Sequence, residues 1–540
     1  MMRALRLALA LLVAAPLVAY ASNSLVIKTD KGKVRGAFTT DNQVRAFKGI
    51  PYAAPPVGDL RWQPPQPAAK WKGVRDATAF GSRCMQAHIY SDMIFRDPGP
   101  SEDCLNLNVW TPSGAKKGSL PVMVWIFGGG FTAGATSEPR QDGQFLAHRN
   151  VVIVSMNYRL GIFGFFVHPE LAAESPHHAS GNYGLMDQNA AIAWVQKNIA
   201  NFGGDPHNIT IFGESAGSES VSDLIASPIA QEHFQKAIGE SGAEFPRYKA
   251  FMLPRTVLEE RNVKFAQAAF GTTILEALRA IPAEELLTKA LVETKIEHIE
   301  FRPDVDGWFL PASLPDIYAA GKQAHIPLLA GWNADEDRAS VTFAKTPVTA
   351  ESFKLKVGAE FGAAAPEFLK LYPANTDAEA VRSAGDFAGD HFLDYSTWRW
   401  LEAQVKTGDA PVYRYRLDLD PPTDKYHPDH IGAFHSDDIE YVFGTLDSRQ
   451  EAHWRPEDRK LSNEIGEYWT NFARTGDPNG GASSANGAIS TNQNLPKWPT
   501  YNAAGGWQVM HLNAVSEAKP DTQRDRYLFL DKEWGKSKQP

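Results

Sequence analysis

The segment TIFGESAGSES, residues 210–220, places a serine between an apolar run and a run of small residues. Residues 208–212 are predicted to form a short buried strand, and the residues from Ala216 onward a helix. Ser215 would lie at the corner, where Gly213 and Gly217 lack the Cβ atoms that would collide in a sharp turn. The pattern predicts a serine that points outward beside the free N–H groups of a helix start.

A serine in that position suits a nucleophile that attacks a carbonyl carbon. The alternative is a turn serine that only caps the helix, and the five-residue G-x-S-x-G pattern does not separate the two. A serine nucleophile also requires a base, an acid that orients the base, and donors for the developing negative charge. The rest of the chain must supply these groups.

The residues around this segment predict an α/β fold. Residues 120–129 and 151–159 are β-branched or aromatic runs, with a helix-like stretch at 142–149 between them and an amphipathic helix at 184–204 after them. Nearly continuous apolar strands that alternate with helices indicate a mostly parallel sheet covered on both faces. No internal repeat or linker divides the chain, so one large domain is expected, with residues 476–494 as a surface loop.

The N-terminus predicts export. Arg3 and Arg6 precede an apolar run that ends in the small-x-small sequence Ala19-Tyr20-Ala21, as in a secretory signal peptide of residues 1–21. The run is short and broken by Pro16, so a stable membrane anchor is not expected, and the mature protein would be periplasmic or secreted. Removal of two arginines and no acids changes the formal charge from −9 to −11, which disfavours nucleic acid as a partner.

The chain has two cysteines, Cys84 and Cys104. A loop-like segment separates them, and an exported protein meets an oxidising compartment. A disulfide between them is therefore expected, with two free buried thiols as the alternative.

The segment IFGGGFTAG places Gly128, Gly129 and Gly130 directly after a predicted strand. Successive N–H groups can turn inward there without obstruction by side chains. The N–H groups of Gly129, Gly130 and Ala216 are predicted to form an oxyanion hole, and a flexible loop is the alternative.

Three histidines, His427, His430 and His435, lie close together in the sequence. They lack both the cysteines and the helical H-E-x-x-H spacing of common zinc sites, so we expect no metal there. No cofactor is expected for the chain.

Eight segments of the chain resemble the type-B carboxylesterase family, which includes cholinesterases and bacterial carboxylesterases. They are FKGIPYAAPPVGDLRW (47–62), SEDCLNLNVWTP (101–112), IFGGGF (126–131), GNYGLMDQ (181–188), NFGGDPHNITIFGESAG (201–217), GWNADED (331–337), HSDDIEYVFG (435–444) and YWTNFARTGDPN (468–479). The resemblance implies one α/β-hydrolase domain over residues 22–540. It also implies a mostly parallel central sheet, helices on both of its faces and large insertions around the active site.

The resemblance implies a catalytic triad of Ser215, Glu336 and His435, in that order along the chain. Chemistry alone would equally allow Asp335 or Asp337 as the acid, and only the resemblance selects Glu336. It also implies that Ser241 and Glu214 support the triad and that Cys84 and Cys104 form the first disulfide of the family. Asp187 is expected to be a structural carboxylate paired with an arginine.

The implied function is a serine carboxylesterase that forms an acyl-enzyme on Ser215, with a small-molecule ester and water as its partners. A binding protein of the same fold that has lost catalysis, or an amidase, is the alternative. The sequence does not indicate the ester or the oligomeric state. Phe131, Trp332 and Phe434 are expected as apolar liners near the triad. Phe127 and Asp337 depart from the residues usual in the family that the chain resembles. The segment between Cys84 and Cys104 contains Tyr90 and Phe95 but no tryptophan.

Overall fold

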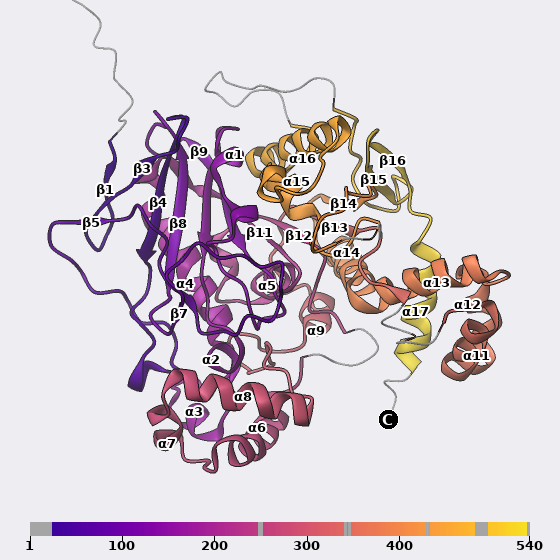
Figure 1. Cartoon of the computed structure of the whole chain (residues 1–540), viewed down its shortest axis with the longest axis horizontal. Coiled ribbons are helices and arrows are strands. Elements are labelled where there is room, and N and C mark those ends of the chain that lie inside the picture. Colours follow the sequence, from indigo (N-terminus) through magenta and orange to yellow (C-terminus); the bar gives the residue numbers. More distant parts are fainter. Residues whose placement is uncertain are drawn as a thin grey trace, which may run out of the picture.

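An eleven-stranded sheet runs through the protein, with the strand order β16-β15-β14-β13-β12-β11-β9-β10-β8-β4-β3 (Figure 1). The computed structural model describes residues 24–246, 252–339, 343, 347–427, 429, 432–480 and 495–536. The proposed signal peptide and residues 481–494 of the expected surface loop lie outside these ranges.

Seven consecutive strands of the sheet are parallel to one another. They are β9 (Leu120–Ile126), β10 (Val152–Met156), β11 (Gly204–Glu214), β12 (Lys236–Glu240), β13 (Leu328–Asn333), β14 (Val412–Leu417) and β15 (Gln508–Leu512). Every residue of β10, β12 and β13 is buried. These three strands are thus covered on both faces, as is typical of parallel strands.

Antiparallel strands complete both ends of the sheet. They are β3 (Ala37–Phe38), β4 (Val44–Pro51) and β8 (Asn106–Pro112) at one end and β16 (Glu517–Pro520) at the other. Three short strands, β1 (Val26–Lys28), β2 (Lys33–Arg35) and β5 (Val74–Asp76), form a separate small sheet near the N-terminal end of the described chain. Two further short strands, β6 (Arg83–Cys84) and β7 (Pro100–Ser101), pair with each other.

Helices pack on both faces of the large sheet, as predicted (Figure 1). On one face, α5 (Ala216–Ala226) packs against β11 and β12 beside α4 (Tyr183–Asn198) and α14 (Tyr395–Thr407). On the other face, α16 (Pro456–Thr475) packs against β9 and β11 beside α15 (Asp438–Phe443) and α1 (Gln144–Ala147).

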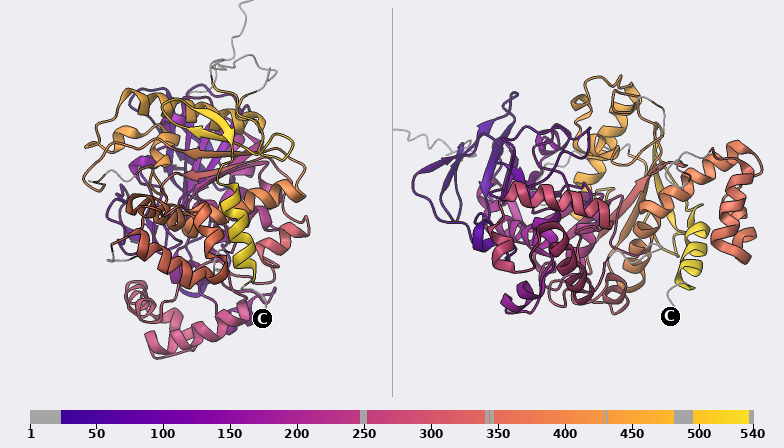
Figure 2. Two further views of the ribbon diagram at one scale, coloured as in Figure 1. Left: turned by 90° about the vertical axis from the view of Figure 1, so that its right-hand side faces the viewer. Right: turned by 60° about the horizontal axis from the view of Figure 1, so that its bottom comes forward.

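Further helices lie outside these two layers. The helices α6 (Arg255–Phe270), α7 (Leu275–Ala280) and α8 (Ala283–Glu297) gather beside α2 (Gly161–Phe165) and α3 (Pro169–Glu174) at the bottom of Figure 1. The helices α11 (Ala350–Phe361), α12 (Ala365–Leu371), α13 (Asp377–Gly389) and α17 (Arg524–Lys536) gather at the end of the molecule away from β1, as the right view of Figure 2 also shows. A short helix, α9 (Leu314–Ala319), packs between α5 and α14.

Two predictions outside the site are confirmed. Cys84 and Cys104 form a disulfide, with their Cα atoms 4.9 Å apart. Asp187 is buried and accepts two hydrogen bonds, of 2.7 and 2.8 Å, from the guanidinium of Arg159. No helix within the described ranges is long and apolar enough to cross a membrane.

Candidate active site

Ser215 occupies a strained turn between β11 and α5, with φ 56° and ψ −124°. The glycines on either side are required by packing, as predicted. A Cβ atom on Gly213 would lie 2.6 Å from the carbonyl oxygen of Ile126, and one on Gly217 would lie 2.0 Å from the same oxygen. Strand β11 is longer than predicted and ends at Glu214, so Ser215 directly follows the carboxyl end of the strand.

The structure brings Ser215, His435 and Glu336 together. His435, in the loop between β14 and α15, places Nε2 2.9 Å from Ser215 Oγ and Nδ1 2.7 Å from Glu336 Oε2. Glu336 follows β13 and is buried. Three segments that are far apart in the sequence thus supply a hydroxyl, an imidazole and a carboxylate in one hydrogen-bonded line.

The second carboxylate oxygen of Glu336 is also held. Ser241 donates its hydroxyl to Glu336 Oε1 at 2.5 Å, and the backbone N–H of Asn333 donates to the same oxygen at 2.7 Å. The side-chain amide of Asn333 donates to the carbonyl oxygen of Phe434 at 2.8 Å, directly before His435. The contact of Ser241 with Glu336 was predicted, whereas the role of Asn333 was not, although this asparagine lies within the segment GWNADED.

Acidic side chains lie close to His435. Glu214 Oε1 lies 3.3 Å from His435 Nε2. Burial lowers the pKa of His435, but the nearby carboxylates of Glu214 and Glu336 outweigh burial and raise that pKa to about 9. Burial raises the pKa of Glu214 to about 8 against the opposing effect of His435. Each of these two side chains therefore favours the charged form of the other.

The glycine loop after β9 lies against Ser215. Gly129 and Gly130 have φ values of 109° and 61°, which glycine adopts readily. Within the described ranges, neither residue donates its backbone N–H to a protein acceptor. A Cβ atom on Gly128 would lie 2.8 Å from Ser215 Cβ, so the loop approaches the serine closely. Successive N–H groups in such a loop can receive an anionic oxygen.

Phe127, directly before the glycines, supports this loop by packing. Its ring stacks on Tyr158 with ring centres 4.5 Å apart, and Tyr158 donates its hydroxyl to the carbonyl oxygen of Phe127 at 2.7 Å. The loop is thus anchored through an aromatic pair rather than through a polar side chain at position 127.

A cavity of about 570 Å³ opens in front of Ser215. Its lining combines charged and apolar side chains with the glycine loop: Tyr90, Asp92, Met93, Gly128, Gly129, Gly130, Thr132, Arg140, Gln141, Glu214, Ser215, Glu219, Glu300, Arg302, Phe392, Leu393, His427, His435, Ser436 and Ile439. A neighbouring cavity of about 360 Å³ shares Asp92, Arg140, His427 and Ser436 with it. A small or medium-sized organic ligand fits this volume.

The prediction of apolar liners was wrong for two of three residues. Phe131 is buried against Phe165, and Trp332 is buried beneath Arg414, so neither lines the cavity. Phe434 lines only the neighbouring cavity. The residues that line the catalytic cavity instead include Phe392 and Leu393, which the sequence analysis did not single out.

The other candidate acids do not contact His435. Asp335 pairs with Arg382 at 2.9 Å, and Asp337 accepts a hydrogen bond from the backbone N–H of Arg338 at 2.7 Å. His427 stacks on Phe434 with ring centres 4.1 Å apart, whereas His430 lies outside the described residues. In the part of the chain that the structure describes, no three His, Cys, Asp or Glu side chains are grouped to hold a metal ion.

A serine at a strand-to-helix turn, on a large mostly parallel sheet with helices on both faces, defines an α/β-hydrolase. The sequence model of the Carboxylesterase family matches residues 23–529. The chain belongs to this family, and it is a serine hydrolase that acts on carboxylic ester bonds.

Individual relatives span most of the chain. Fumonisin B1 esterase of Sphingopyxis macrogoltabida is 37% identical over 494 residues, which cover 89% of this chain and 85% of that protein. Para-nitrobenzyl esterase of Bacillus subtilis (strain 168) is 36% identical over 530 residues, which cover 94% and 99%. A solved thermophilic PNB esterase is similar in structure, with a TM-score of 0.77, 35% identity and coverage of 94% of this chain and 100% of the other.

Proposed function

We propose that the protein hydrolyses carboxylic esters through an acyl-enzyme on Ser215. The observation that carries this proposal is the imidazole of His435, which bridges Ser215 Oγ and Glu336. His435 Nε2 would take the Ser215 proton as Oγ bonds to the ester carbonyl carbon, and would then give that proton to the leaving alkoxide as the ester C–O bond breaks. Water would attack the acyl-enzyme by the same route, releasing the acid and restoring Ser215.

Glu336 would fix the tautomer and orientation of His435 and stabilise the imidazolium that forms. Its two hydrogen bonds, from Ser241 and Asn333, support this role because they leave Oε2 facing His435 Nδ1. The N–H groups of Gly129, Gly130 and Ala216 would stabilise the negative oxygen of the tetrahedral intermediate.

The same proposal extends to location and domain organisation. Residues 1–21 would be removed on export, and residues 22–540 would act as one domain in the periplasm or outside the cell. The disulfide between Cys84 and Cys104 is compatible with that compartment.

A panel of esters tests the reaction class. The panel should include p-nitrophenyl esters of increasing acyl length, a p-nitrobenzyl ester because of the relative named for it, and matched p-nitroanilides for the amidase alternative. The proposal predicts turnover of the esters, inactivation by an organophosphate and little turnover of the anilides. Faster cleavage of the anilides would favour an amidase, and no turnover of any substrate would favour a binding protein.

A further inference from the structure

Two loops of the candidate triad are joined directly before their reacting residues. The backbone N–H of Asp335 donates to the carbonyl oxygen of Ala433 at 2.9 Å, and Asp335 and Phe434 form an isolated parallel bridge. A Cβ atom on Gly432 would lie 2.0 Å from Asp335 Oδ2, so the carboxylate also packs tightly against the histidine loop. Asp335 thus fixes the segment before Glu336 against the segment before His435.

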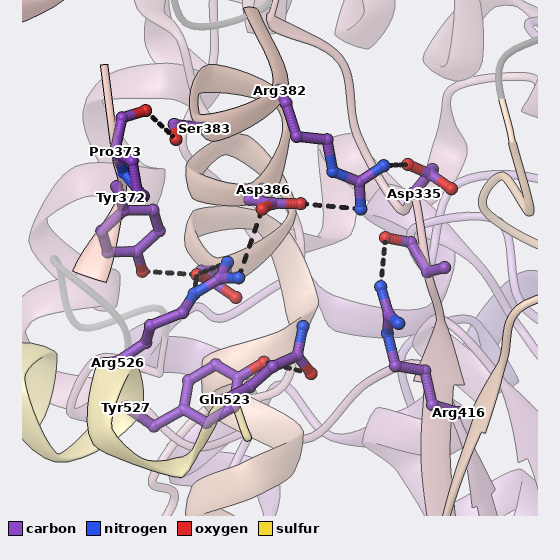
Figure 3. A network of polar contacts seen from close by, with 12 residues as sticks. Asp335, Tyr372, Pro373, Arg382, Ser383, Asp386, Arg416, Gln523, Arg526 and Tyr527 are labelled. Atoms are coloured by element: carbon purple, nitrogen blue, oxygen red, sulfur yellow. Dashed lines mark hydrogen bonds and ion pairs between the residues drawn. The ribbon is translucent and has the colours of Figure 1, made fainter. Parts of the chain in front are cut away.

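Arg382, on α13, holds the carboxylate of Asp335 from outside. Its Nη1 donates to Asp335 Oδ1 at 2.9 Å, and its Nη2 lies 3.0 Å from Asp386 Oδ1, one helical turn further along α13 (Figure 3). Arg416 of β14 donates to the carbonyl oxygen of Ala334 at 3.3 Å, on the other side of the acid loop (Figure 3). Two guanidinium groups therefore hold the short segment that precedes Glu336.

The polar contacts continue from Asp386 to the C-terminal helix. Arg526 of α17 donates to Asp386 Oδ2 at 3.3 Å and to Asp390 Oδ2 at 2.5 Å, and Tyr372 donates its hydroxyl to the same oxygen of Asp390 at 2.5 Å (Figure 3). Arg526 and Asp390 are buried, so this end of the network is shielded from water.

Asp390 begins a π-helical turn, Asp390–Asp394, which separates α13 from α14. Such turns are rare and occur frequently at functional sites. This one places Phe392 and Leu393 in the lining of the catalytic cavity, and the ring of Phe392 lies edge-on to His435 with ring centres 5.0 Å apart.

Both ends of the network therefore reach His435. One end holds the loop whose Glu336 contacts Nδ1, and the other end anchors the turn whose Phe392 contacts the imidazole ring. We propose that Arg382 is a positioning residue, which aligns His435 through the network Asp335–Arg382–Asp386–Arg526–Asp390. This inference rests on the proposed function, in which His435 is the base.

The position of Arg382 makes the proposal testable. Its side chain is 56% exposed and does not line the catalytic cavity, so its loss should neither empty the core nor remove a substrate contact. A misplacement of about 1 Å can cost about 100-fold in rate, so a small shift of His435 would lower kcat.

The test compares Arg382→Met and Arg382→Lys with a control, Lys532→Met, in the full-length mature protein. Lys532 lies on α17, in the same group of helices as Arg382. Its side chain is 54% exposed and pairs with Glu367 of α12 at 3.2 Å. We expect Arg382→Met to lower kcat for p-nitrophenyl acetate about 10-fold with KM changed less than about two-fold. Arg382→Lys should recover part of kcat, and Lys532→Met should match the parent enzyme.

The pH profile separates alignment from a change in charge. Carboxylates of Glu214, Glu336 and Asp438 act on His435, and a looser contact with Glu336 would lower the pKa of His435. The acid limb of kcat/KM should then move to lower pH in Arg382→Met. If Arg382→Met only removed a distant positive charge and did not move His435, the pKa of His435 would rise and the acid limb would shift to higher pH.

A double variant completes the test. If Arg382 acts through Asp335, then Asp335→Asn combined with Arg382→Met should cost little more than the larger single effect. The proposal is overturned if Arg382→Met matches Lys532→Met in kcat and pH profile, if KM alone changes, or if the double variant is additive. Retained turnover in Ser215→Ala would instead reject the proposed function, which this comparison of Arg382 and Lys532 does not test.

Discussion

Glu214 Oε1 lies 3.3 Å from His435 Nε2, the same nitrogen that lies 2.9 Å from Ser215 Oγ. A carboxylate and a hydroxyl thus lie beside the same nitrogen of the imidazole. The carboxylate favours the protonated ring, whereas attack by Ser215 requires the unprotonated one. The active fraction of the enzyme should therefore depend on pH through this pair.

Glu214→Gln should move the acid limb of the kcat/KM profile to lower pH. Nearby carboxylates raise the pKa of His435, so removing one of them lowers that pKa, and the unprotonated imidazole persists to lower pH. The measurement is kcat/KM for an uncharged p-nitrophenyl ester from acidic to alkaline pH, because the pKa of His435 in the parent enzyme is about 9. Glu300→Gln is a matched control, since Glu300 lines the same cavity but pairs with Arg302 at 3.7 Å. An unchanged limb, or one at higher pH, would contradict this assignment.

Glu336→Gln should lower kcat by roughly 10⁴-fold, as expected when the residue that fixes the histidine tautomer is lost. Asp335→Asn and Asp337→Asn should each cost far less, because neither carboxylate reaches His435. Steady-state kinetics of the three variants on one ester decide between these acids. A large loss of kcat in Asp337→Asn, together with nearly parental kcat in Glu336→Gln, would assign the role of the acid to Asp337 instead.

Two alanine substitutions in the glycine loop should differ sharply. A Cβ atom on Gly129 would lie 2.1 Å from the carbonyl oxygen of Ala133 at φ 109°, so Gly129→Ala must displace the loop. The displaced donors should cost on the order of 100-fold or more in kcat. A Cβ atom on Gly130 would have the Tyr90 hydroxyl, 3.5 Å away, as its nearest neighbour. Gly130→Ala should therefore lower the free energy of unfolding by about 1–2 kcal/mol, for the left-handed backbone alone. Equal losses of kcat in the two variants would argue against this role of the loop.

Choline esters should have no large advantage over uncharged esters with the same acyl group. The segment between Cys84 and Cys104 has no tryptophan, and Phe95 is engaged by Arg83, whose guanidinium lies 4.5 Å from the ring centre. Tyr90 alone contributes an aromatic ring from this segment to the cavity, and it would contribute roughly 0.5–2 kcal/mol toward a cation. The measurement is kcat/KM for acetylthiocholine against an uncharged thioacetate. A large preference for the cation would mean that other cavity residues bind it.

The sequence predicted the features that depend on local geometry. The strand-to-helix turn at Ser215 followed from the glycines around it, and strands β9 and β10 followed from apolar runs that only a covered sheet can bury. The resemblance supplied the acid and the histidine, which lie 121 and 220 residues after Ser215 in the sequence and which local patterns could not select.

The predictions that were wrong or missing share one physical cause, which is contact between segments far apart in the chain. Trp332 was expected in the cavity, but its ring lies 4.1 Å from the Arg414 guanidinium and 5.7 Å from the ring of Tyr527. Asn333, next to it, reaches the carbonyl oxygen before His435. No periodicity within β13 distinguishes these environments, because the neighbours come from β14, α17 and the histidine loop.

Ester turnover by Ser215→Ala tests directly whether Ser215 is the nucleophile. Thermal unfolding of the variant and its mass after exposure to an organophosphate should be measured on the same protein. The lost hydroxyl would form a covalent bond to substrate rather than a core contact, so the fold should survive. We predict an unchanged Tm, no covalent adduct and a loss in kcat of about 10⁶-fold. Turnover near the parental rate in a folded Ser215→Ala protein would show that Ser215 is not the nucleophile.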